Sequence, residues 1–72
     1  MEKMNVFIFK TSVNEKCLKE ATAIINTTIP KLKWNFDLED CDNILRIESN
    51  TNISHTICST LNKIGIYCEE LH

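Results

Sequence analysis

Glycine and proline are almost missing from this sequence, which has one of each in 72 residues, and its uninterrupted apolar runs are short. The scarcity of glycine and proline excludes low-complexity linkers, and no run comes near the roughly 18 apolar residues of a membrane helix. An excess of basic residues is lacking too, because 8 Lys and Arg face 10 Asp and Glu, for a net charge of −2. We therefore expect no membrane and no nucleic-acid partner.

Catalytic patterns are also lacking. No glycine-rich phosphate loop, nucleophile–base pair or convergent set of carboxylates is recognisable, so we do not expect an enzyme. What is present is the composition of a globular domain, with 43% hydrophobic and 25% charged residues. A chain of this length has room for one core, so residues 1–72 are expected to form a single domain. The apolar run near the start is too short for a signal peptide, which favours a cytoplasmic protein whose four cysteines are thiols.

Hydrophobic periodicity predicts six elements in the order strand, helix, strand, strand, helix, strand. Gly65 closes the second helix, and Asn52 and Ser54 are alternative caps for its start. This order is that of the ferredoxin-like α+β fold. Right-handed crossovers place both helices on one face of a four-stranded antiparallel sheet, with strand order 4-1-3-2. The expected strands are residues 5–10, 31–38, 44–48 and 66–71, and the expected helices run from about 14 to 28 and from 53 to 64.

The junction between the first strand and the first helix carries a cysteine. Ser12 followed by Glu15 fits a capping box, and Asn14 is an alternative cap. Cys17 then falls in or beside the first helical turn, where the positive end of the helix dipole favours a thiolate. A strand–turn–helix junction with a sulfur at its mouth suits a soft metal ion.

Four segments carry a family resemblance over nearly the whole chain, through their order and spacing: residues 9–11, 34–39, 44–48 and 61–65. The chain resembles the heavy-metal-associated domain family, the small ferredoxin-like domains of copper chaperones and metal-pumping ATPases. That family carries a Met-x-Cys-x-x-Cys type loop before its first helix. Without a gap, the two family cysteines fall on Glu15 and Leu18; with one loop residue deleted, the second falls on Cys17. We prefer the deletion, because it keeps Cys17 and Leu18 in the apolar phase of the helix. In both alignments the metal loop is degenerate.

The degenerate loop predicts that chaperone-type metal binding is lost and that the protein has no cofactor, because such a site needs two thiolates in one short loop. The alternative is a carrier of reduced affinity that holds copper or another soft metal ion through Cys17, between two chains. The other cysteines offer weaker ligands. Cys58 is assigned to the core side of the second helix, Cys68 faces the core, and Cys41 lies in a hairpin turn across the sheet.

The sheet face away from the helices predicts a different role. If Phe7 and Phe9 face the helices, period-two alternation turns their strand neighbours outward. Several apolar side chains on adjacent strands then form a contact surface for a protein partner or a weak homodimer. We therefore expect a protein-interaction or homodimerising module on a heavy-metal-associated scaffold. The residues of this predicted surface are Val6, Ile8, Ile44, Tyr67 and Leu71.

Overall fold

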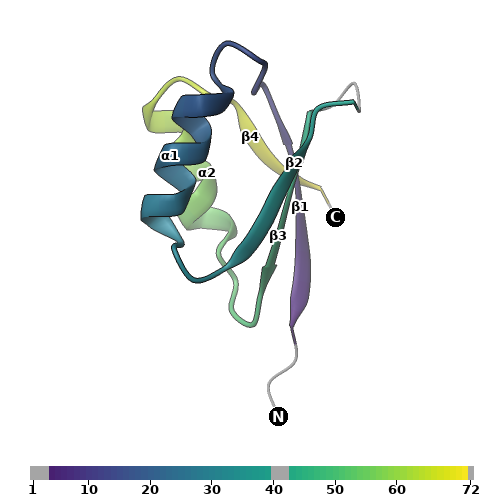
Figure 1. The fold of residues 1–72 in the computed structure, drawn as a ribbon. Coiled ribbons are helices and arrows are strands. Elements are labelled where there is room, and N and C mark those ends of the chain that lie inside the picture. Colours follow the sequence, from purple (N-terminus) through teal and green to yellow (C-terminus); the bar gives the residue numbers. More distant parts are fainter. Residues whose placement is uncertain (1–3, 40–42, 72) are drawn as a thin grey trace.

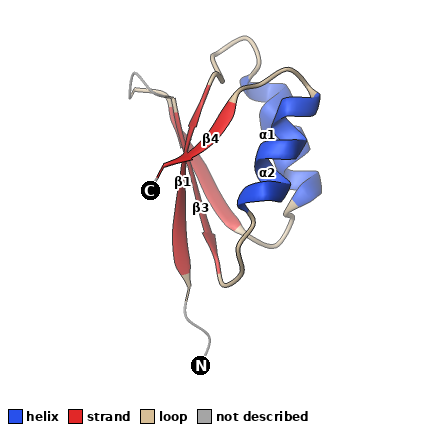
Figure 2. Ribbon diagram, turned by 180° about the vertical axis from the view of Figure 1, so that it is seen from behind, coloured by secondary structure: helices blue, strands red, loops and turns tan. Residues whose placement is uncertain are grey.

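The computed structural model describes residues 4–39 and 43–71, and it has two layers, a four-stranded sheet and a pair of helices (Figure 1). The sheet order is β2-β3-β1-β4, and all neighbouring strands are antiparallel. Both helices cover the same face of the sheet (Figure 2). The predicted ferredoxin-like α+β fold is therefore confirmed, and the order read from the β4 edge is 4-1-3-2. The elements are β1 (Asn5–Thr11), α1 (Leu18–Thr28), β2 (Lys33–Asp37), β3 (Ile44–Ser49), α2 (Ser54–Lys63) and β4 (Cys68–Leu71).

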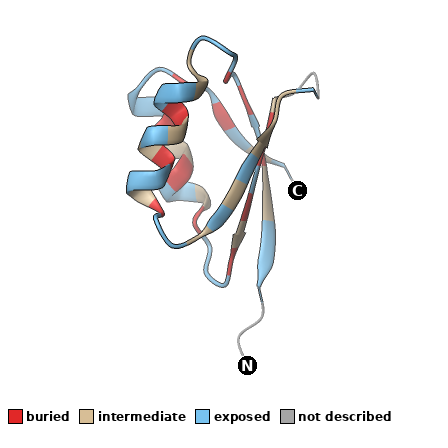
Figure 3. Cartoon of the chain, in the orientation of Figure 1, coloured by how far each residue is buried: buried red, intermediate tan, exposed pale blue. Residues whose placement is uncertain are grey.

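The core lies between the sheet and the two helices (Figure 3). On β1, Phe9 is fully buried and sits opposite Leu45 of β3, so alternate residues of these central strands face the helices. α1 contributes Ala21 and Ile25, and α2 contributes Ile57 and Leu61 at the spacing of one helical face. Neither α1, with 11 residues, nor α2, with 10, is long and apolar enough to cross a membrane.

The first helix begins later than expected, and its predicted capping box is wrong. The Ser12 hydroxyl accepts a hydrogen bond from the Tyr67 amide (2.8 Å), so it is not available to α1. Asn14 Oδ1 instead accepts from the amides of Lys16 (2.9 Å) and Cys17 (3.3 Å), which holds residues 15–17 in a separate turn. α1 therefore starts at Leu18, and Cys17 occupies its N-cap position without a side-chain cap.

Neither of the two caps that the sequence leaves open occupies the N-cap position of α2, which is Ile53 and has no side-chain cap hydrogen bond. Asn52 Oδ1 accepts a hydrogen bond from the Ser54 amide at 2.9 Å. The Ser54 hydroxyl is buried and has no hydrogen-bond partner. At the other end, Gly65 follows α2 with φ +81°, a left-handed conformation that glycine adopts without the steric cost of a Cβ.

Three connections meet at one end of the domain, as the topology predicts. Thr11 Oγ1 donates to the carbonyl of Asn43 (2.7 Å), the residue before β3, and accepts from the Val13 amide (3.2 Å). Ser12 and Tyr67 exchange two hydrogen bonds, which join the first loop to the segment between α2 and β4. The predicted turn around Cys41 lies outside the described residues.

Candidate functional site

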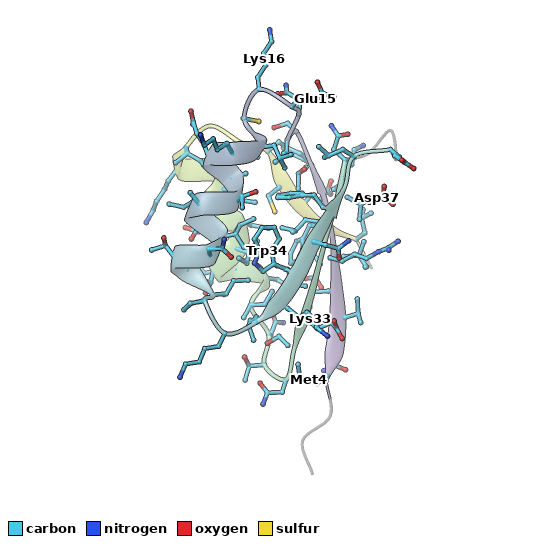
Figure 4. The ribbon with its side chains drawn as sticks, viewed as in Figure 1. Met4, Glu15, Lys16, Lys33, Trp34 and Asp37 are labelled. Atoms are coloured by element: carbon cyan, nitrogen blue, oxygen red, sulfur yellow. The ribbon has the colours of Figure 1, made fainter. Side chains whose placement is uncertain are left out.

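The first loop positions Cys17 at the mouth of α1, close to the tip that Glu15 and Lys16 occupy (Figure 4). Cys17 is half-buried and packs against the edge of the core. Its Sγ accepts a hydrogen bond from the Asn14 amide at 3.3 Å, so the sulfur faces back into its own loop. The first loop therefore contains a single thiol, which is held by one backbone amide of the same loop.

The described residues contain no group of three or more His, Cys, Asp or Glu side chains that could hold a metal ion. Cys17, the metal ligand of the alternative hypothesis, therefore has no such cluster around it among these residues. His55 lies at the start of α2, the end of the helix away from Gly65. The arrangement can offer a soft metal ion a single thiol per chain at this loop, and a two-coordinate site there would need a second chain.

The strand register places the predicted interaction surface on the side of the sheet away from the helices. Phe9 is directed into the core, and Ile8, its neighbour on β1, sits opposite Arg46 of β3 and Leu71 of β4. Residues directly opposite in adjacent strands share a face. Figure 4 shows the same division on β2, where Trp34 lies between sheet and helices and Lys33 lies on the other side. We call this uncovered side the outer face.

Exposure separates the five predicted surface residues. Val6 is 59% exposed, Tyr67 52% and Leu71 39%, while Ile8 is half-buried between its strand neighbours. Ile44 is a correction: it shares the outer face but is 6% exposed and takes no part in the main core cluster. The residues directly opposite it are Lys10 and Asp37 on the two neighbouring strands, so a position in the middle of the sheet leaves it little open surface.

Charged side chains surround the exposed apolar residues of the outer face. Two of the three rows of opposite residues hold charges of both signs, and the middle row holds one positive charge. The rows are Lys33–Glu48–Val6, Asn35–Arg46–Ile8–Leu71 and Asp37–Ile44–Lys10–Glu69. Between β1 and β2 the surface has a shallow hollow of about 390 Å³ that is lined by both charges and by Val6. The outer face is thus polar over β2 and β3, and on β1 and β4 its apolar residues Val6, Ile8 and Leu71 are bounded by the Lys10–Glu69 row.

Tyr67 precedes β4, on the other side of the Lys10–Glu69 row from Ile8 and Leu71, so it does not join the apolar residues of the predicted surface, and it is held in place by a carboxylate. Its hydroxyl donates a hydrogen bond to Glu69 Oε2 at 2.6 Å. This bond, followed by weaker effects of desolvation and of the Glu69 charge, raises the pKa of Tyr67 above its ordinary value. The phenol therefore stays neutral, with one edge fixed and the ring open to a partner.

One contact was missed by sequence reasoning. Cys58, on α2, lies with its Sγ 3.3 Å from Sγ of Cys68 at the start of β4. The assignment of Cys68 to the core is consistent with its burial, but the assignment of Cys58 to the core alone overlooked this pairing. The sequence feature that could have indicated this contact is the spacing of ten residues between the two cysteines, with the end of α2, Gly65 and the start of β4 between them.

Comparison of the chain with models of protein families, with curated proteins and with solved structures found no match.

Proposed function

We propose that this protein is a small interaction module that forms a homodimer through the outer face of its sheet. The observation that carries the proposal is the gathering of Val6, Ile8 and Leu71 on one uncovered face, on strands that are directly hydrogen bonded. On this interpretation the chain keeps a scaffold like that of the heavy-metal-associated family and has lost chaperone-type metal binding at its first loop. A cytoplasmic location belongs to the same proposal.

The size of the outer face sets the strength of the proposed dimer. Four strands spaced about 4.8 Å apart and about five residues long cover roughly 300–350 Å². A standard stable interface buries about 800 Å² on each partner. The proposed contact therefore lies in the weak class, and a dissociation constant in the micromolar range or above is expected.

The charges of the outer face favour a second copy over a strongly charged partner. Lys33 and Arg46 carry positive charge, and Glu48 and Glu69 carry negative charge on the same face. A two-fold axis brings each patch against itself, so a surface with both signs can pair each cation of one copy with an anion of the other. A strongly basic or acidic partner would find half of these charges repulsive.

Sedimentation velocity over a concentration series tests the proposal. The wild-type protein should shift from monomer toward dimer as concentration rises, and Val6→Lys should remain monomeric at the concentrations where the wild type dimerises. The new lysine faces Glu48 across the β1–β3 pair, so the substitution suits the folded monomer while it places a charge in the contact. Ala23→Lys is the matched control, because Ala23 is exposed on α1. A wild type that stays monomeric at millimolar concentration would overturn the homodimer.

A second candidate function is a carrier that holds Cu(I) between two chains, each giving Cys17. The observation that favours it is the placement of a partly exposed thiol at the mouth of a helix. This dimer would join the two molecules at the first loop, far from the outer face. It predicts one metal ion for every two chains, association that depends on Cu(I), and loss of both in Cys17→Ser.

A further inference from the structure

Two cysteines from different elements of the fold lie in direct contact. The Sγ atoms of Cys58, in the second turn of α2, and Cys68, the first residue of β4, are 3.3 Å apart. Two thiolates on one tetrahedral zinc ion, each about 2.3 Å from the metal, lie about 3.8 Å apart. The observed sulfurs are closer than that, and a disulfide needs them to approach to about 2.05 Å. The described residues around the two sulfurs form no group of three or more His, Cys, Asp or Glu side chains, so a zinc ion there would lack the ligands that it needs, whereas a bond between the sulfurs needs no further group.

The two thiols differ in access to solvent. Cys58 is half-buried and lines a surface hollow of about 440 Å³ together with His55, Ser59 and Lys63. Cys68 is 7% exposed, and burial, with the contact to Cys58 as a further cause, raises the pKa of its thiol. A small oxidant in the hollow therefore meets Cys58 first, and Cys68 stands behind it as the second thiol.

We infer that Cys58 and Cys68 form a redox pair, in which Cys58 takes up a low-molecular-weight disulfide of the glutathione type and Cys68 resolves it into an intramolecular disulfide. The positive charge of Lys63 in the hollow suits the carboxylates of such an oxidant. The bridge would join α2 to β4, the edge strand that pairs with β1 through four residues. This site is separate from the first loop and independent of the proposed dimer.

The exchange proceeds in two balanced steps. Cys58 Sγ loses its proton and attacks one sulfur of oxidised glutathione, whose S–S bond breaks; one glutathione leaves as a thiolate, takes up a proton, and the other remains bound to Cys58. Cys68 Sγ then loses its proton and attacks Cys58 Sγ, and the second glutathione leaves in the same way. The protein loses two electrons and two protons, and one glutathione disulfide becomes two thiols.

The cysteines are distributed so that trypsin separates all four. Cleavage after lysine and arginine puts Cys17 in peptide 17–19, Cys41 in 34–46, Cys58 in 47–63 and Cys68 in 64–72. The experiment treats the native protein with oxidised glutathione, blocks remaining thiols, digests without reductant and quantifies linked peptides by mass spectrometry. We expect peptides 47–63 and 64–72 to be linked, in excess over every other pairing by about two orders of magnitude.

The protein unfolded in guanidinium is the control for sequence proximity. Cys58 and Cys68 are separated by ten residues and the next nearest pair by seventeen, so loop closure alone favours the pairing about twofold in the unfolded chain. Cys68→Ser should stop the reaction at a glutathione adduct on Cys58, and Cys17→Ser should leave the linkage unchanged. A native preference no larger than that of the unfolded chain would overturn the inference, as would a wild-type protein that keeps glutathione on Cys58.

Discussion

Phe9 and Val6, on opposite faces of β1, should differ sharply in what their substitution costs. Phe9 is fully buried between sheet and helices, and Phe→Ala in such a site costs about 3–5 kcal/mol through lost burial and the cavity that remains. A 72-residue domain is stable by roughly 4–11 kcal/mol, so Phe9→Ala should remove much or all of the free energy of unfolding. Val6→Thr keeps the side-chain shape at an outer-face position that is 59% exposed, and should change stability by less than about 0.5 kcal/mol.

Urea unfolding followed by tryptophan fluorescence measures both effects. Trp34 is the only tryptophan in the chain, and its ring packs edge-on against Phe36 with centroids 5.6 Å apart, so its emission reports loss of packing. With a slope of about 1 kcal/mol per molar urea for a domain of this size, Phe9→Ala should lower the midpoint by about 3 M or unfold the protein without urea. A small loss for Phe9→Ala together with a loss of several kcal/mol for Val6→Thr would mean that the faces of β1 are assigned the wrong way round.

Three further predictions concern the thiols and the phenol. A disulfide between Cys58 and Cys68 closes a loop of about eleven residues, and oxidation should raise the free energy of unfolding by roughly 2.7 kcal/mol in urea titration; a midpoint that does not rise would contradict the geometry. The phenol absorbance of Tyr67 should titrate with a midpoint above 10.0, and Glu69→Ala should lower it; because the folded pKa is raised, any stability linked to the neutral phenol is present below pH 10 and lost as the pH rises through that folded pKa. Cys17→Ser should not change the amount of Cu(I) that the monomer keeps against a chelator, and a marked loss would show that the first loop still holds metal.

The fold could be predicted from the sequence because its signals are local and repeated. Strict alternation in β2 and helical spacing in α2 each assign a buried face without knowledge of the partner element. The start of α1 could not be assigned in the same way, because Ser12 is taken by a hydrogen bond to Tyr67, which is 55 residues away in the sequence. Sequence patterns show which side chains could cap a helix, but they do not show that a backbone amide from a distant part of the chain will bind one of those side chains after folding.

The candidate sites were predicted less completely, for a related reason. Alternation places Ile44 on the outer face, but its burial depends on which residues of the two neighbouring strands stand opposite it. The contact between Cys58 and Cys68 depends on the rotation of α2 about its axis and on where β4 begins, two residues later than the apolar pattern indicates. Hydrophobic periodicity predicts which side of a helix or strand a residue faces, but it does not give the side-chain position accurately enough to predict that two sulfur atoms are in contact.

The most direct test of the proposed function is a dilution series followed by two-dimensional amide NMR, because each shifted signal identifies the surface that leaves a contact. On dilution from millimolar to micromolar protein, the account predicts concentration-dependent shifts in β1 and β4, centred on Val6, Ile8 and Leu71, with the exposed residues of α1 unchanged. Val6→Lys should abolish these shifts and keep the dispersion of a folded protein. Shifts confined to the helices or to the first loop, or none at any concentration, would contradict the claim that the outer face is an interface.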